Sequence, residues 1–264
     1  MSDTLKGEYF FNGANQKDIP RRLTALEEGY DPGTVSRLES LGVGHGWTCL
    51  EVGAGAGSIT RWLSDRVGKK GRVVAADLDT SFLDVSDARN VEVRQLDLRS
   101  DGMPGGTFDL VHTRFVLGHI PERVDVIDSL IGALRPGGWL LLEEMDVFAW
   151  GAIDSGLHPE VLLAGIVPIE EHGFAPRWGR EMPALLRDRG LVDISAVAEA
   201  PIVKGGSPAL EWLRLTFDQM MEHGLPFEVP GEHTYEKWRR LTNDPGQWLT
   251  GASIVAARGQ RPVF

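Results

Sequence analysis

The stretch LEVGAGAGSIT, residues 50–60, decides the fold of this chain. It joins an apolar, strand-like run to a helix-like segment through three glycines, Gly53, Gly55 and Gly57. A glycine-rich turn between a strand and a helix lets a ligand come close to the backbone, at the electropositive N-terminus of the helix. The stretch therefore predicts an α/β sheet with a ligand site where its first strand ends.

Two acidic residues follow the next two strand-like runs. Asp77 comes directly after the run 72–76, and Asp97 follows the run 91–96. An acidic side chain at the tip of the second strand can accept hydrogen bonds from both ribose hydroxyls of a nucleoside. Three successive strand tips thus offer groups to one adenosine-like ligand.

The spacing of the glycines differs from that of the dinucleotide-binding fingerprint, G-x-G-x-x-G. Here the spacing is G-x-G-x-G, Glu51 precedes it, and Ser58 stands at the third position of the fingerprint. An NAD-dependent oxidoreductase stays open as an alternative. It predicts a second nucleotide-binding half, and the sequence shows none after the fourth strand-like run.

The turn E-x-G-x-G-x-G, followed by Asp77 and Asp97, resembles the class I S-adenosylmethionine-dependent methyltransferases. The resemblance continues through FDLVHTRFVLGHIPE (108–122) and LRPGGWLLLEE (134–144), which are similar to the fourth and fifth strands of that family. Its strong motifs cover about residues 47–146. The YFFN start and the VHTRF and LGHIPER stretches are similar to bacterial methyltransferases that modify small secondary metabolites.

The resemblance implies S-adenosyl-L-methionine as the cofactor. In the family, the glycine turn holds the amino-acid part of the cofactor. The resemblance also implies that Asp77 binds the ribose, Leu78 packs on the adenine and Asp97 binds the adenine amino group. The residues expected at the cofactor are Glu51, Gly53, Gly55, Gly57, Asp77, Leu78, Asp97, Leu98 and Arg114. For Arg114, an ion pair with an acid near the strand tips is an equal alternative.

Length and composition limit the classes of function. A chain of 264 residues suits one α/β domain with an embellishment, or two small domains. The net charge of −11 and the lack of a basic stripe argue against nucleic-acid binding through phosphates. No signal-peptide pattern opens the chain, and no apolar stretch approaches the ~20 residues that span a bilayer. We expect a cytoplasmic protein without nucleic-acid or membrane partners, either a monomer or a homodimer.

No metal site is expected. Cys49 is the only cysteine and belongs to the first predicted strand. The histidines outside the predicted core are too scattered to form a cluster, and a zinc site needs several such ligands together. They are His158, His172, His223 and His233.

The alternation of strands and helices predicts a doubly wound, Rossmann-like sheet. The family resemblance implies seven strands, the last antiparallel, and a helical cap. Predicted strands cover 47–52, 72–76, 91–96, 108–112, 139–144, 192–200 and 253–257. Predicted helices cover 20–28, 33–41, 58–67, 81–88, 122–134, 159–171, 180–188, 208–223 and 235–241.

This pattern suggests a division of the chain. Residues 1–46 form an N-terminal helical lid segment, and residues 47–147 form the cofactor-binding core. The segments 148–178 and 206–250 are expected as cap insertions over the substrate, by resemblance to small-molecule methyltransferases. Residues 179–205 and 251–264 supply the remaining elements of the core sheet.

Methyl transfer from a sulfonium is an in-line displacement that depends on holding both reactants in line, away from water. A hydroxyl, amine or ring carbon can also need a group that takes its proton. His119, after the fourth strand, is the first candidate for that base, and Tyr9 is a weaker one. His112 lies within the strand and is expected to be a packing or hydrogen-bonding residue.

Other residues could shape the acceptor pocket. Three acids, Glu143, Glu144 and Asp146, follow the fifth strand, and one of them is expected to face the pocket. Most tryptophans of the last third are expected in the core, with one or two lining the pocket and favouring a flat or apolar acceptor. They are Trp178, Trp212, Trp238 and Trp248.

The sequence therefore predicts a methyltransferase that acts on a small, aromatic or apolar metabolite. O-methylation is the commonest chemistry of such enzymes, C-methylation of an electron-rich ring such as indole is the specific alternative, and N-methylation stays open. A non-catalytic protein that only binds the cofactor is a further alternative.

Overall fold

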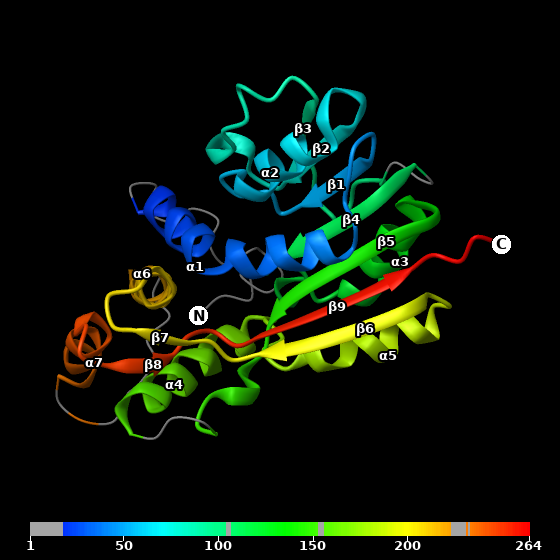
Figure 1. Ribbon diagram of the computed structural model, residues 1–264. Helices are drawn as coiled ribbons and strands as arrows, with labels where there is room; N and C mark the ends of the chain where they lie inside the picture. The colour runs from blue at the N-terminus through cyan, green and yellow to red at the C-terminus, as the bar shows by residue number, and fades with distance from the viewer. Residues whose placement is uncertain (1–17, 104–106, 153–155, 223–230, 232) are drawn as a thin grey trace.

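A computed structural model describes residues 18–103, 107–152, 156–222, 231 and 233–264. Its centre is a seven-stranded sheet with the order β3-β2-β1-β4-β5-β9-β6 (Figure 1). The strands are β1 (Thr48–Val52), β2 (Arg72–Asp77), β3 (Val91–Gln95), β4 (Phe108–Arg114), β5 (Leu134–Met145), β6 (Val192–Glu199) and β9 (Ile254–Gln260). Only β9 runs antiparallel to its neighbours, β5 and β6. The predicted fold class is confirmed.

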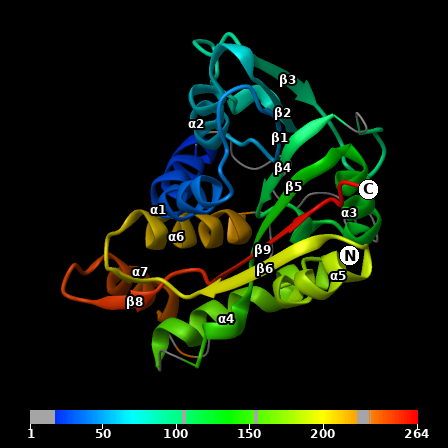
Figure 2. The same cartoon turned by 45° about the vertical axis from the view of Figure 1, so that its right-hand side comes forward.

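Helices cover both faces of the sheet (Figure 2). On one face lie α1 (Ile19–Ser40) and α2 (Ser58–Val67), which share a core cluster with β1, β2 and β4. On the other face lie α3 (Arg123–Ala133) and α5 (Met182–Asp188), which share a second cluster with the central strands. Helix α2 buries Ile59, Leu63 and Val67, one turn apart, so its apolar stripe faces the sheet.

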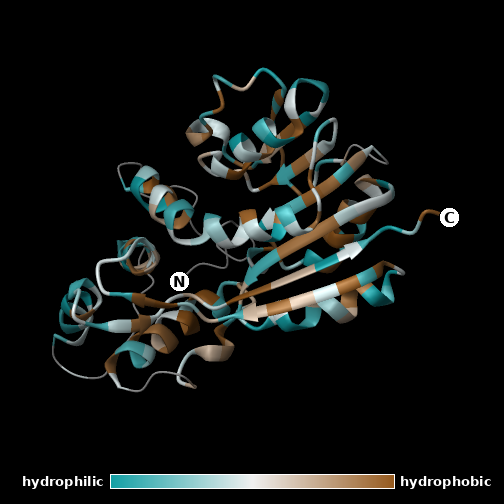
Figure 3. Ribbon diagram, viewed as in Figure 1, coloured by the Kyte–Doolittle hydropathy of each residue, from teal (hydrophilic) through white to brown (hydrophobic). Residues whose placement is uncertain are grey.

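A third layer gathers beside the carboxyl edge of the sheet (Figure 1). It contains α4 (Leu157–Glu171), α6 (Pro208–Glu222) and α7 (Thr234–Asn243), together with a short sheet of β7 (Ile202–Lys204) and β8 (Trp248–Thr250). Their apolar side chains form one cluster with part of α1, which includes Tyr30 and Trp238. Apolar residues are concentrated on the central strands of the large sheet (Figure 3).

Three predicted elements differ in the structure. The helices expected at 20–28 and 33–41 are one helix, α1, which continues through Pro32 because Tyr30, Thr34 and Leu38 anchor both halves. The helix expected at 81–88 is only a 3₁₀ turn, Thr80–Phe82, since the Asp79 and Asp84 side chains there accept the backbone N–H groups of Ser81 and Ser86 instead. Strands β7 and β8 were not predicted.

Two findings bear on partners. Within the described ranges, no helix combines the length and the apolar character needed to cross a membrane. Over the same part of the chain, no three His, Cys, Asp or Glu side chains are grouped so that they could hold a metal ion.

Candidate active site

A cavity of about 250 Å³ opens at the carboxyl edge of the sheet. The tips of β1 to β5 line one side of it, and α1, α4 and α6 supply other walls. The strand register sets three of these tips level, because Val52 pairs with both Ala76 and Thr113. Ligands of open α/β sheets bind at this edge.

The glycine turn brings its backbone to the cavity. Gly53, Gly55 and Gly57 have φ angles of 75°, 56° and 91°, which residues with side chains rarely adopt. A Cβ on Gly53 would lie 2.2 Å from Val116, so packing also requires glycine there. Gly53 and Gly55 line the cavity. Gly57, expected at the cofactor, packs against Leu83 and is not among the described lining residues.

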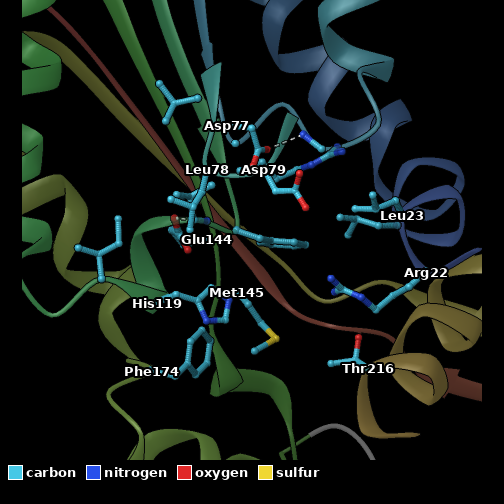
Figure 4. A pocket seen from close by; sticks show the side chains of 18 of the residues that line it. Arg22, Leu23, Asp77, Leu78, Asp79, His119, Glu144, Met145, Phe174 and Thr216 are labelled. Carbon is cyan, nitrogen blue, oxygen red and sulfur yellow. Dashed lines mark hydrogen bonds between the residues drawn. The ribbon is translucent and has the colours of Figure 1, made fainter. Parts of the chain in front are cut away.

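Asp77 lies at the tip of β2, where its side chain borders the cavity (Figure 4). Its carboxylate accepts the backbone N–H of Gly55 at 2.8 Å and that of Asp79 at 3.1 Å. Burial raises the pKa of this carboxyl, and the N–H donors lower it in part. The same two bonds fix the carboxylate between the first and second strand tips, beside Leu78.

Asp97 and Leu98 line the cavity after β3. The Arg99 guanidinium donates to the Asp97 carboxylate, with Nη2 at 2.7 Å, and the Arg99 backbone N–H donates at 2.9 Å. Hydrogen bonding to Arg99 holds the pKa of Asp97 below its ordinary value. Asp97 is therefore a stable anion at the place where the resemblance puts the adenine.

Glu51 does not reach the cavity, unlike the other acids expected at the cofactor. Its buried carboxylate lies 2.7 Å from His112 Nδ1, and the other ring nitrogen lies 3.1 Å from Glu143 Oε2. Burial lowers the pKa of His112, but the two carboxylates raise it more, to about 9. The protonated His112 of β4 is thus a buried cation between two anions, Glu51 of β1 and Glu143 of β5.

This buried cluster ties α1 to the sheet. Arg37 Nη1 donates to Glu143 at 2.6 Å, and the Thr34 hydroxyl donates to the same carboxylate at 2.6 Å. Arg114 donates to Thr34 at 2.9 Å and to Asp31 at 2.8 Å. Arg114 therefore forms an ion pair, which was one of its two expected roles. It also lines the cavity.

His119 and Glu144 line the cavity near the tips of β4 and β5 (Figure 4). The His119 ring packs on Phe174 with centroids 4.7 Å apart. Burial, and then the charges of Arg22 and Arg123, lower the pKa of His119 to about 4. Its imidazole is therefore neutral at physiological pH. Tyr9, the weaker candidate base, lies outside the described residues.

Of the three acids Glu143, Glu144 and Asp146 near the end of β5, Glu144 is the one that lines the cavity. Its carboxylate accepts the backbone N–H groups of Val116, Leu117 and Gly118 at 2.8–3.2 Å, so it holds the turn that carries His119. Burial raises its pKa to about 7, although these N–H donors lower it. Of the other two acids, Glu143 belongs to the buried cluster and Asp146 pairs with Arg180.

The end of the cavity away from β3 is mostly apolar. Ile166 and Ile169 of α4, Met145 and Phe174 contribute to its walls. Phe115 stacks on Trp212, with ring centroids 5.6 Å apart and planes inclined by 19°. Of the four tryptophans considered for the pocket, Trp212 lines it, Trp178 and Trp238 are buried elsewhere, and Trp248 is 62% exposed.

Several lining residues had no signal in a single sequence. Phe115 has a φ of 58°, a strained value for a residue with a side chain, and it follows β4 directly. Trp150, Arg22 and Thr216 also line the cavity. An arginine and a threonine within otherwise ordinary amphipathic helices look like surface residues until the helices are packed together.

A family model described as "Methyltransferase domain" matches residues 50–142. Methyltransferase str3 of Strobilurus tenacellus is 28% identical over 187 residues, 69% of this chain and 65% of that protein. The ubiquinone/menaquinone biosynthesis C-methyltransferase UbiE of Saccharophagus degradans is 34% identical over 168 residues, 54% of this chain and 68% of that protein. For the UbiE of Stutzerimonas stutzeri the chain spans 45% of the relative's length.

Solved methyltransferase structures share the fold. Phosphoethanolamine N-methyltransferase 2 of Haemonchus contortus superposes with a TM-score of 0.60 and 17% identity, over 96% of this chain and 59% of that one. At this identity the likeness shows the fold alone. Together with the sequence relatives and the cavity at the glycine turn, it settles the family: the chain belongs to the class I S-adenosylmethionine-dependent methyltransferases.

Proposed function

We propose that this chain transfers a methyl group from S-adenosylmethionine to a small, aromatic or otherwise apolar acceptor. The observation that carries the proposal is a single cavity with two chemically different ends. One end has the glycine turn and two acids at strand tips, and the other has an apolar wall built from α1, α4 and α6. A bisubstrate reaction needs both kinds of surface in one enclosed space.

The residues at the first end suit the cofactor. Gly55 leaves room for the ligand at the backbone, because among the described residues only Leu23 lies within 4 Å of a Cβ built there. Asp77 offers a fixed carboxylate for ribose hydroxyls, and Asp97 an anion for an amino group. Leu78 and Leu98 add apolar contacts for the base. When bound, the cofactor supplies a methyl group already activated on a sulfonium.

The residues at the second end would hold and shield the acceptor. We assign α4 and α6, within the segments 148–178 and 206–250, to the cap over the substrate. Phe174, Trp212 and the isoleucines of α4 suit a flat aromatic or apolar body. They also exclude water, which strengthens the electrostatic interactions that position a nucleophile.

His119 is our candidate for the group that receives the acceptor's proton. Its imidazole borders the cavity and is neutral at physiological pH, so it can accept a hydrogen bond from a hydroxyl, an amine or a ring N–H. Glu144, whose pKa is raised to about 7, is the second candidate in the same wall.

Oxygen, carbon and nitrogen are the three candidates for the methylated atom. O-methylation is the general expectation for small-molecule methyltransferases. C-methylation gains support from the UbiE relatives, which are named as C-methyltransferases, and from the aromatic lining of the apolar end. An electron-rich ring such as indole is then the acceptor to try first, and N-methylation is tested with the same compounds.

Calorimetry on the purified chain tests the proposal. We expect micromolar binding of S-adenosylhomocysteine and no binding of NAD. A screen of phenols, indoles and aromatic amines with labelled S-adenosylmethionine then identifies the acceptor class. Cofactor binding without any transfer would favour a non-catalytic cofactor-binding protein, and the absence of S-adenosylhomocysteine binding would overturn the proposal.

A further inference from the structure

The apolar end of the cavity contains a buried cation. Arg22 comes from α1, lines the cavity, and exposes only 8% of its surface. Its side chain extends from α1 into the space beside Thr216 of α6 (Figure 4). A guanidinium stays protonated at any physiological pH and presents donors in a plane that matches a carboxylate. This wall therefore offers charge and geometry that a purely apolar acceptor does not use.

A buried hydroxyl accompanies the guanidinium. Thr216 Oγ1 is buried, and it has no hydrogen-bond partner among the residues that the structure describes. Figure 4 shows this hydroxyl on the side of Thr216 that faces Arg22. Buried hydroxyls are nearly always hydrogen-bonded in folded proteins, so a ligand oxygen beside Arg22 would complete the site.

The described acids of the cavity do not lie beside Arg22. The acids Asp77, Asp79 and Asp97 belong to the strand tips at the other end of the cavity. Nearer by, Glu144 is engaged by three backbone N–H donors, and His119 is neutral, its pKa lowered in part by the charge of Arg22. On the α1–α6 side, the described lining therefore presents the Arg22 guanidinium and the Thr216 hydroxyl as groups that suit a ligand oxygen.

The two faces of α1 separate this anion site from the glycine turn. Leu23 lies over Gly55, and Glu27 accepts the Ser58 backbone N–H at 3.2 Å, so this face of α1 covers the turn. Arg22 precedes Leu23 by one position, about 100° around the helix, on the side of α6. The carboxylate that the cofactor itself carries is thus the less suitable partner for Arg22.

We propose that the methyl acceptor carries an acidic group, a carboxylate in the first instance, which Arg22 binds and Thr216 hydrogen-bonds. This inference rests on the proposed function and narrows its substrate class to amphipathic aromatic acids. The acid would lie between α1 and α6, and the apolar body would extend along Phe174 and Trp212 toward the strand tips.

Matched pairs of acids and amides test the inference. Indole-3-acetate with indole-3-acetamide, and 4-hydroxybenzoate with 4-hydroxybenzamide, are titrated into the protein saturated with S-adenosylhomocysteine. Because hydrogen bonds to a charged group are stronger than neutral ones, we expect at least one acid to bind about 10-fold or more tightly than its amide. The Arg22→Met variant should lose this preference and keep its affinity for S-adenosylhomocysteine.

Three further variants complete the design. Arg22→Lys keeps the charge and should keep part of the preference, while Thr216→Val should weaken only the acids. Arg21→Met is the matched control, because Arg21 is its chain neighbour, is 66% exposed and pairs with Glu211. It should leave all affinities unchanged. Thermal unfolding of each variant verifies its fold. If Arg22→Met does not fold, the preference for acids is compared between Arg22→Lys and the wild-type protein instead.

The possible outcomes are distinct. The inference is overturned if no acid binds more tightly than its amide, including the case in which neither binds. It is also overturned if the preference survives in Arg22→Met, or if this variant loses affinity for S-adenosylhomocysteine, since Arg22 would then serve the cofactor. A wild-type protein that does not bind S-adenosylhomocysteine would instead refute the proposed function itself.

Discussion

Two side chains in one wall of the cavity have ionisation behaviour that separates their roles. The pKa of His119 is lowered to about 4 and that of Glu144 is raised to about 7. If His119 accepts the proton, the rate of methyl transfer should be flat between pH 6 and 9, since the imidazole is neutral throughout. If Glu144 is the base, the rate should rise through pH 7. A pH–rate profile with saturating substrates distinguishes them.

Variants assign the group responsible. His119→Ala should lower kcat by about 100-fold or more, the usual contribution of a general base, with S-adenosylhomocysteine affinity nearly unchanged. Glu144→Gln should disturb the turn at Val116–Gly118, because an amide cannot accept at both ends as the carboxylate does. His45→Ala, on a loop before β1, is the control. A wild-type kcat in His119→Ala would exclude its role as base.

For Asp77 we predict a change in the affinity for S-adenosylhomocysteine rather than in the rate of methyl transfer. With Asp77 in its proposed role at the ribose, Asp77→Ala should remove charge-assisted hydrogen bonds and weaken S-adenosylhomocysteine binding by about 1–3 kcal/mol. Asp65→Ala, an exposed substitution on α2, controls for the change in net charge. Equal affinities of the two variants by calorimetry would mean that the ribose site is elsewhere.

Among the elements, α1 depends on the buried cluster around His112. The folded-state pKa of His112 is raised to about 9 from its model-peptide value of 6.5. A raised pKa stabilises the fold fully below pH 6.5, and this contribution is lost as the pH rises through 9. The free energy of unfolding should therefore decrease between these pH values. Denaturant titrations at several pH values measure it.

The substitution His112→Gln removes the central cation and leaves two buried carboxylates facing each other. It should cost about 3–5 kcal/mol of stability, as expected when one partner of a buried ion pair is deleted. The loss of stability between pH 6.5 and 9 should also become smaller. His45→Gln, a substitution at an exposed position, should change neither quantity. An unchanged pH dependence in His112→Gln would locate its origin in another group.

The elements also show what the sequence can and cannot predict. The boundaries of α2 follow from its glycine turn and its apolar spacing, and the predicted segment 58–67 matches the helix. The continuity of α1 could not be foreseen, because Pro32 locally disfavours a helix and the anchoring partners of Thr34 and Arg37 are on distant strands. Tertiary contacts decided the outcome there.

At the scale of the whole molecule, the cavity is closed by segments far apart in the chain. Asp77 and Asp97 were predictable because each follows a strand of the same parallel sheet. Arg22 and Thr216 were not, since their helices are almost 200 positions apart and only packing brings them together. Sequence reasoning therefore reached the cofactor end of the site and left the acceptor end largely undefined.

Because several segments meet at the cavity, ligand binding should stabilise the entire fold. S-adenosylhomocysteine at 100 times its Kd should add about 2.7 kcal/mol to the free energy of unfolding and raise Tm by roughly 5–10 °C. NAD at the same concentration should produce no shift. Differential scanning fluorimetry measures both, with Asp77→Ala as the variant in which the shift should shrink. An equal shift with NAD would contradict the family's cofactor preference.

Helix α1 has a consequence for engineering the specificity for the acceptor. Adjacent residues of this rigid helix, Arg22 and Leu23, face the two ends of the cavity. A substitution that rotates or shifts α1 to admit a bulkier acceptor must therefore also move the wall over Gly55. Directed evolution for new acceptors should then accumulate its tolerated changes on α4 and α6, and keep α1 nearly unaltered.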